Sequence, residues 1–325
     1  MRSLLELPTL EAQSLLARGT PVFLPVNPVE YHGPHLSLHT DALICAGLIR
    51  DLHAHLAERH PEWPLLAVDD LHVGVDPVPG PGSRPVPYAT VRDFVTLACR
   101  ALADMGAQRV VLMAFHLSPP HSRALEGGVT LLRARGVRAV APFNLIPPLL
   151  MGADQGELAR IMLGKRHPAL EAARAGLTAD FHAGCLETSL ALHYAPHSVH
   201  PRYVEMPPCP SVQRDRALHA VALAAQRLGR RTLAHELDFA AVARGWFALR
   251  PFPGYTGLPH LASARAGGKL ARLCTNEMLP AVTRVLEGEG SSPAPFMGWV
   301  RSATLGGRVL QLRVPPEAVQ PPQLS

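Results

Sequence analysis

The chain has 325 residues, of which 47% are hydrophobic and 18% are charged, and this balance excludes an intrinsically disordered protein. The length allows one large domain or two small ones, and it is enough to bury a substantial core. The net charge is only +5 and the arginines are not interleaved with aromatic residues, so we expect no nucleic-acid partner.

The cysteines and the apolar segments indicate a cytoplasmic protein. The five cysteines are an odd number, lie far apart and form no C-x-x-C pair, so reduced thiols are expected. The N-terminus lacks a signal-peptide core because Glu6 and Pro8 interrupt its apolar residues. No apolar run approaches the length of a membrane span, and we therefore expect no membrane partner.

Strand-like and helix-like patterns alternate along the first half of the chain. We expect strands at the short apolar runs and helices where apolar residues recur on one face. The expected elements are a helix at 8–18, a strand at 22–26, a helix at 42–59, a strand at 65–68, a helix at 90–105, a strand at 109–115, a helix at 122–135 and a strand at 137–143. This alternation predicts an α/β fold with a mainly parallel sheet flanked by helices on both faces.

The second half of the chain is expected to be mostly helical. Helical segments are predicted within 145–175, at 188–194 and at 212–228, and a closing helix runs to about residue 286. We divide the chain into an α/β domain at residues 1–287 and a C-terminal extension at residues 288–325. Residues 309–314 of this extension alternate as a strand does, which predicts an edge strand or a subunit contact.

A polar stretch from Pro25 to Asp41 follows the strand at 22–26 and forms the first candidate site. Glu30 and His32 are two positions apart, so both side chains point to the same face of an extended segment. Asp41, at the start of the next helix, can turn back toward them, and these N and O donors suit Zn²⁺, Mn²⁺ or Fe²⁺. The alternative is that Asp41 simply caps the helix. The nearby histidines at positions 35 and 39 are expected behind the ligands or on the surface.

The letters E-Y-H-G-P-H-L-S-L-H-T-D at residues 30–41 resemble the signature E-x-H-G-x-H-L-P-L-x-T-D of the creatininase family of metal-dependent amidohydrolases. The resemblance implies a creatininase-like three-layer sandwich with Glu30, His32 and Asp41 as metal ligands. It also implies that Asp41 bridges two ions. Similarity to the family covers residues 4–287 in four separate blocks.

A second block lies at the end of the strand at 109–115, where His116 takes the place of the histidine in the family's N-G-H-G-G-N. The resemblance implies that His116 is a metal ligand, although a lone histidine at a strand end is usually structural. The glycine-rich surroundings of this histidine are absent here, and Leu117 and Pro119 should narrow or reshape the pocket. His121 is expected at the surface or at the start of a helix.

A third block, A-D-F-H-A-G-C-L-E-T-S at residues 179–189, resembles the family's H-A-G-x-x-E-T-S segment. The resemblance implies that Glu187 completes a dinuclear site and that His182 lies beside the substrate as an acid/base or oxyanion-stabilising group. Some family members take this ligand from a glutamate two residues after the strand-end histidine, but that position is Ser118 here. The alternative for Glu187 is a place in the first turn of a helix, where a carboxylate is favourable.

The loop at 74–87 contains too many prolines for a helix or a central strand. It stands where the family carries G-x-S-x-E-H followed by P-G-T, and the Glu-His pair is absent. We interpret this as a changed substrate, with neutral divergence of the loop as the alternative. The segment at 252–264 resembles the family's late G-x-x-G-D-P-x-x-A-T element, with Leu258 in place of the usual aspartate.

Together these observations predict a metal-dependent hydrolase of a non-peptide C–N bond in a small-molecule amide, lactam or formamide. Two divalent ions, zinc first and manganese or iron as alternatives, lower the pKa of a bridging water and polarise the carbonyl. His182 passes a proton to the leaving nitrogen. The resemblance also suggests a homo-oligomer. The competing hypothesis is an inactive binding or maturation protein with the creatininase fold, whereas no G-x-S-x-G motif supports a Ser-His-Asp hydrolase.

Overall fold

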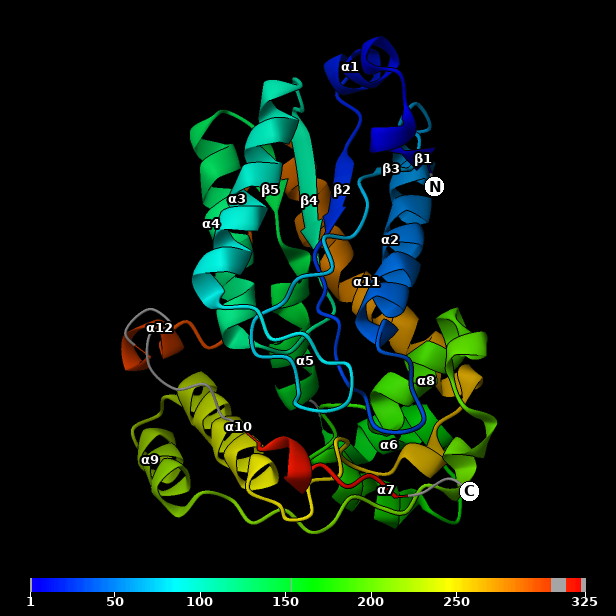
Figure 1. The fold of residues 1–325 in the computed structure, drawn as a ribbon, viewed down its shortest axis with the longest axis vertical. Helices are drawn as coiled ribbons and strands as arrows, with labels where there is room; N and C mark the ends of the chain where they lie inside the picture. Colours follow the sequence, from blue (N-terminus) through cyan, green and yellow to red (C-terminus); the bar gives the residue numbers. More distant parts are fainter. Residues whose placement is uncertain (1, 153, 305–313, 323–325) are drawn as a thin grey trace.

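The computed structural model describes residues 2–152, 154–304 and 314–322, and its centre is a parallel β-sheet (Figure 1). Within these residues the sheet has five strands in the order β1-β3-β2-β4-β5. The strands are β1 (Arg2–Ser3), β2 (Val22–Pro25), β3 (Leu66–Ala67), β4 (Arg109–Met113) and β5 (Arg138–Val140). Every pairing in this sheet is parallel, as the alternation of strands and helices predicts.

Helices form most of the remaining regular structure in the described ranges. The α-helices are α1 (Thr9–Ala17), α2 (Thr40–Arg59), α3 (Tyr88–Asp104), α4 (Pro119–Ala134), α5 (Ile146–Gly152), α6 (Gln155–Leu163), α7 (Leu170–Leu177), α8 (Cys185–Tyr194), α9 (Arg216–Arg227), α10 (Arg231–Phe247), α11 (Ala264–Glu287) and α12 (Val300–Ala303). The short 3-10 helices are η1 (Leu4–Glu6), η2 (Pro142–Leu145), η3 (Pro196–Ser198), η4 (Pro201–Glu205), η5 (Pro259–Leu261) and η6 (Pro316–Ala318). Helix α1 lies at one end of the molecule, and α9 and α10 lie at the other (Figure 1). No described helix has both the length and the apolar character that crossing a membrane requires.

One face of the sheet packs against α2 and α11. Successive side chains of a strand point to opposite faces, so Phe23, Val111 and Met113 share one side. These residues belong to a buried apolar cluster that includes Leu48 of α2 and Met278 of α11. Burying both strands and helices in one cluster fixes these helices against the sheet.

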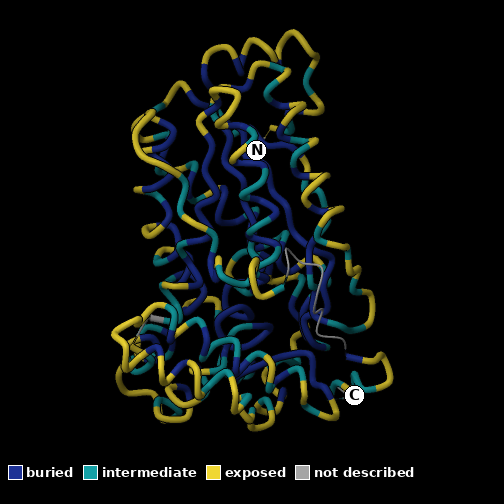
Figure 2. Tube along the Cα trace, turned by 90° about the vertical axis from the view of Figure 1, so that its left-hand side faces the viewer, coloured by how far each residue is buried: buried dark blue, intermediate teal, exposed yellow. Residues whose placement is uncertain are grey.

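The opposite face of the sheet packs against α1, α3 and α4. Leu24 and Val110 point to this side and join a second buried cluster with Leu16, Val95 and Val129 from the three helices. In Figure 2 buried trace fills much of the interior of the molecule, and most of the exposed residues lie toward its margins. The sheet is therefore the middle layer of a three-layer α/β sandwich, which confirms the predicted fold class.

Several elements differ from those expected. The sequence patterns predicted neither β1 nor α10. The expected strand at 137–143 is shorter, because the chain turns into η2 at Pro142, and a proline cannot donate a ladder hydrogen bond. The expected C-terminal strand at 309–314 lies outside the described residues except for Val314, which is buried.

Candidate metal centre

Six polar side chains meet near the carboxyl ends of β2 and β4, the edge at which parallel sheets place ligands. They are Glu30 and His32 in the loop after β2, Asp41 in the first turn of α2, His116 just after β4, His182 before α8, and Glu187 in the first turn of α8. All six are buried, with exposures of 9% or less. The structure thus brings together all the residues that the sequence singled out, while their individual roles stay predictions.

Asp41 stands between two groups of potential ligands. Its Oδ1 lies 3.2 Å from His32 Nε2, and its Oδ2 lies 3.7 Å from His116 Nδ1. The same His32 nitrogen is 3.4 Å from Glu187 Oε1. The same His116 nitrogen is 3.0 Å from Glu30 Oε2. A carboxylate whose two oxygens face different groups has the geometry of a bridging ligand.

Within each group the ligand atoms are close enough to share an ion. Three sets have ligand atoms within 4.8 Å of one another, namely Glu30 with Asp41 and His116, His32 with Asp41 and Glu187, and Glu30 with His32 and His182. Donors bonded at about 2.1 Å to one ion are separated by up to about 4 Å, so small shifts would complete each set. The third set places His182 within the cluster, and the sequence had placed it only beside the substrate.

Backbone carbonyls orient the three histidines of the cluster. His32 Nδ1 lies 2.9 Å from Glu30 O, His116 Nε2 lies 2.9 Å from Val75 O, and His182 Nε2 lies 2.9 Å from Tyr31 O. A carbonyl only accepts hydrogen bonds, so in the neutral ring each of these nitrogens carries the proton. The second nitrogen of each ring then presents its lone pair to the cluster, as is typical of metal-binding histidines.

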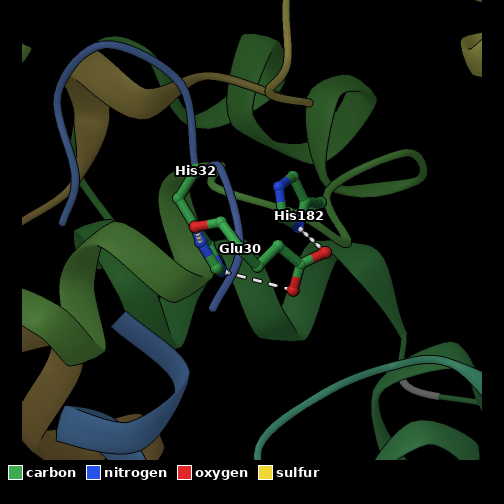
Figure 3. Close-up of side chains that lie close together, drawn as sticks. All are labelled: Glu30, His32 and His182. Carbon is green, nitrogen blue, oxygen red and sulfur yellow. Dashed lines mark hydrogen bonds and ion pairs between the residues drawn. The ribbon is translucent and has the colours of Figure 1, made fainter. Parts of the chain in front are cut away.

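The carboxylate of Glu30 connects two neighbouring histidine rings. Figure 3 shows it reaching toward His32 and His182: its Oε2 lies 4.0 Å from His32 Nε2, and its Oε1 lies 4.0 Å from His182 Nδ1. The centroids of these two rings are 4.5 Å apart. Glu30 Oε1 also accepts the backbone N–H of Val78 at 2.6 Å, so the loop at 74–87 holds this carboxylate in place.

The pKa values of the carboxyl groups reveal a shortage of positive charge in the cluster. Burial alone would raise the pKa of Glu30, yet the neighbouring His116 lowers that pKa well below its ordinary value. Burial raises the pKa of Asp41 well above its ordinary value, and the charges of Glu30 and Glu187 add to this effect. Adjacent carboxyl groups with opposite shifts compete for the same limited positive charge.

This buried cluster fits divalent metal ions. Among the described side chains, Glu30 Oε2 and Asp41 Oδ2 are buried atoms without a hydrogen-bond partner. Such unpaired carboxylate oxygens are costly to bury, and a cation between them would satisfy both. Carboxylate oxygens together with imidazole nitrogens form a donor set that suits Zn²⁺, Mn²⁺ or Fe²⁺.

A buried carboxylate holds the loop that carries His182. Asp180 accepts the backbone N–H groups of Cys185 at 2.7 Å and of Leu186 at 3.2 Å, and these are the first residues of α8. A backbone N–H of the same loop donates to Glu187 Oε2 at 2.5 Å. Asp180 therefore caps the helix and sets the positions of both His182 and Glu187.

Replacing Asp180 by alanine is expected to lower the free energy of unfolding by about 2 kcal/mol, because the cap is lost and two buried N–H groups lose their acceptor. Urea unfolding with a chelator present measures this loss apart from any effect of metal. The control is Asp154→Ala, since Asp154 caps α6 with a fully exposed carboxylate that water can replace. A loss in Asp180→Ala no larger than that in the control would contradict the role of the buried cap.

Two further histidines of the candidate motifs lie in the interior. His35 Nε2 is 3.0 Å from Thr188 Oγ1, which places His35 behind the cluster, one of its two predicted places. His121 lies in the first turn of α4, as expected, but the prediction of a surface position is wrong because it is fully buried. Its Nε2 lies 3.0 Å from the carbonyl of Val26, a contact between distant segments that no local pattern reveals.

A cavity of about 900 Å³ opens onto the cluster. Both segments that depart from the family pattern, the loop at 74–87 and residues 115–119, contribute to its wall. The sequence interpretation missed helix α10 as a contributor, and within the loop it did not single out Asp76. Asp76 has a positive φ of 53°. Burial raises the pKa of its carboxyl group, and the charge of His116 partly opposes this rise. An acidic residue before a proline in this loop is the one sequence signal that marks it.

A three-layer sandwich with carboxylates and histidines gathered at the carboxyl edge of its sheet defines a class of metal-binding α/β proteins. A profile of the creatininase family, described as creatinine amidohydrolase, matches residues 5–282. The chain therefore belongs to the creatininase family of metal-dependent amidohydrolases, as its motifs suggested. No curated protein sequence matches it.

Solved creatininase structures share this fold. One described as creatininase Mn is 20% identical and has a TM-score of 0.56, over 86% of this chain and 98% of that one. A mutant creatininase of Zn-Zn type is 20% identical and has a TM-score of 0.58, over 87% of this chain and 98% of that one. A mutant creatininase complexed with creatine is 20% identical and has a TM-score of 0.57, over 88% of this chain and 99% of that one. At identities this low, the structural similarity establishes the common fold and nothing more specific.

Proposed function

We propose that this protein is a metal-dependent hydrolase of a non-peptide C–N bond in a small-molecule amide, lactam or formamide. The observation that carries the proposal is the convergence of carboxylates and histidine lone pairs on one wall of a large cavity. Family membership supports the same chemistry, and one related structure is a creatininase complexed with creatine.

The donor set accommodates two divalent ions. Glu30, Asp41 and His116 would hold one ion, and His32 and Glu187 would hold the other together with the shared Asp41. Zinc is our first candidate and manganese the second, since related structures are Zn-Zn and Mn forms, and the donor chemistry also allows iron. When bound, such ions supply a water of lowered pKa and polarise a carbonyl oxygen.

His182 is positioned to move the proton in this reaction. Its Nε2 is engaged by the carbonyl of Tyr31, so its Nδ1 faces Glu30 and the cavity. Burial, reinforced by the charge of His32, lowers the pKa of His182 and keeps the ring neutral. A neutral ring can accept a proton from the attacking water and deliver it to the nitrogen as the C–N bond breaks.

Glu187 is the carboxylate that we propose in place of the glutamate missing at Ser118. The Ser118 hydroxyl accepts a backbone N–H at 3.3 Å and caps α4. Glu187, in contrast, lies 3.4 Å from His32 Nε2. A site that holds no ion would instead favour the competing hypothesis, a binding or maturation protein that keeps the fold without the activity.

Metal analysis and an amide panel test this proposal together. Protein purified without chelator is expected to carry about two metal equivalents and to hydrolyse members of a panel of formamides, lactams and linear amides. Glu187→Ala is expected to lose about one equivalent and its turnover. The control is Glu171→Ala, an exposed glutamate on α7. Absence of metal, even after titration with Zn²⁺, Mn²⁺ and Fe²⁺, would reject the hydrolase in favour of the binding protein.

Three expectations about the whole protein also belong to this proposal. A cytoplasmic location agrees with the free cysteines in the described chain. A homo-oligomer is expected from the family resemblance. We place the boundary between the catalytic domain and the C-terminal extension after residue 287, because the family match ends at residue 282 and α11 ends at Glu287.

A further inference from the structure

We infer that the cavity selects amides with one large apolar substituent, and that chain segments beyond the family match form part of the selecting wall. This inference rests on the proposed function, because it assigns a substrate class to the same site. In the reaction, the oxygen of water bonds to the carbonyl carbon, the C–N bond breaks and the nitrogen takes up a proton. The products are a carboxylate and an amine.

The wall of the cavity is largely aromatic and aliphatic. Aromatic rings from well-separated segments line it, among them Phe115, Phe143, Phe181, Phe239, Phe247 and Trp299. The volume of about 900 Å³ lies near the upper end of the range of about 300–1,000 Å³ typical of sites for drug-sized ligands. A small polar amide would leave most of this apolar surface in contact with water, whereas a large apolar substituent would cover it.

Several polar side chains on this wall are already engaged within the protein. Ser83 Oγ donates to a backbone carbonyl at 2.6 Å, and Ser118 Oγ accepts a backbone N–H at 3.3 Å. Arg244 Nε pairs with Asp215 Oδ2 at 3.0 Å. Asp76 lies next to the cluster, because the carbonyl of the preceding residue, Val75, is 2.9 Å from His116 Nε2. These internal contacts occupy part of the hydrogen-bonding capacity of the polar groups, and most of the other residues of the wall are apolar.

Helix α10 holds one strip of the C-terminal extension against the cavity. Glu236 of α10 accepts the backbone N–H of Met297 at 3.2 Å and the indole N–H of Trp299 at 2.8 Å. Upstream, Ser292 Oγ accepts the backbone N–H of Ala141, which follows β5, at 3.0 Å. These contacts fix Met297 and Trp299 as part of the cavity wall.

A second strip of the extension completes the same wall. Val314, Pro315 and Pro316 line the cavity. Next to them, Ala318 O accepts the backbone N–H of Phe252 at 2.7 Å, and Phe252 forms a parallel bridge with Val319. Since the family match ends at residue 282, both strips add apolar surface from outside the matched region.

Tryptophan fluorescence can report occupancy of the cavity without turnover. Trp246 and Trp299 lie on the wall, whereas Trp63 stacks on His60 with ring centroids 3.8 Å apart and lines no part of the cavity. The titrants are primary alkanamides from acetamide to octanamide and N-alkylformamides of matching lengths, added to chelator-treated and to metal-loaded protein. We expect Kd to fall roughly threefold for each added methylene in at least one series, in both forms of the protein.

The variant Glu236→Ala tests the strip at 297–299. It removes the acceptor that holds Trp299, so Kd for the longest amides is expected to rise about tenfold, while Kd for acetamide changes less than about twofold. His235→Ala, the exposed neighbour on the same helix, is the matched control. Circular dichroism verifies folding. If Glu236→Ala does not fold, Phe239→Ala truncates the wall directly and is expected to show the same selective loss.

A Kd that does not depend on chain length in either series would overturn the inference. If Glu236→Ala and Phe239→Ala both gave the same Kd values as His235→Ala, then neither α10 nor the extension would contribute to the selection of long amides. Both results are readable in chelator-treated protein, so neither depends on metal or activity. Failure of the proposed function would give a different result. The protein would take up no metal and hydrolyse no amide, yet it would still bind longer amides more tightly.

Discussion

Asp41→Asn is expected to release both metal ions and to lower amide turnover at least about a thousandfold. The two oxygens of Asp41 lie 3.2 Å and 3.7 Å from the ring nitrogens of different histidines, so one substitution weakens both ion sites at once. Metal ions contribute several kcal/mol of transition-state stabilisation, and each ~1.4 kcal/mol corresponds to a factor of ten in rate. The effect should exceed that of Glu187→Ala, because Glu187 belongs to one set of ligands.

Elemental analysis after gel filtration, together with initial rates on the best amide of the panel, measures this effect. Asparagine matches aspartate in size, so the fold should persist. The control is Asp93→Asn on the exposed side of α3, where Asp93 pairs with Arg92. The structure does not support the capping alternative, because the N-cap position of α2 is His39 and no side chain makes a capping hydrogen bond there. An Asp41→Asn protein that kept about two equivalents of metal would contradict the bridging role and leave Asp41 only a favourable place in the first turn of the helix.

The first part of the cluster could be predicted because its geometry is local. The two-residue spacing of Glu30 and His32 places both side chains on one face of an extended loop, and Asp41 opens the following helix. The family resemblance placed His116 beside them, and the structure gives the physical reason: β4, which precedes His116, neighbours β2 in the parallel sheet. The strand-helix alternation that predicts this sheet is visible in the apolar pattern itself.

The surroundings of the cluster were harder to predict because they depend on distant segments. Helix α10 turns apolar side chains to two sides: Leu237 packs with α9, and Phe239 and Phe247 face the cavity. Such a helix shows no single apolar stripe. The burial of His121 depends on the carbonyl of Val26, 95 residues away in the chain. Strand β1, with two residues, is too short for any periodic pattern.

His182→Asn is expected to lower kcat by about 10²–10⁴-fold while metal content stays unchanged, since it removes the acid/base group and leaves the five proposed ligands in place. In the wild type, His182 Nδ1 faces the cavity and burial lowers the pKa of the ring. A neighbouring cation would lower this pKa further, because it also disfavours the protonated ring. Turnover is therefore expected to rise with pH through a pKa below the ordinary histidine value and to reach a plateau above it.

The measurement is kcat and KM across pH, with metal content determined on the same preparations. In His182→Asn the acidic limb of the kcat profile that comes from this ring should disappear, and KM should change little because the histidine acts on the proton rather than on binding. His39→Asn, an exposed histidine just before α2, is the control. Loss of a metal equivalent in His182→Asn would contradict the acid/base role and would make His182 a ligand in the set with Glu30 and His32.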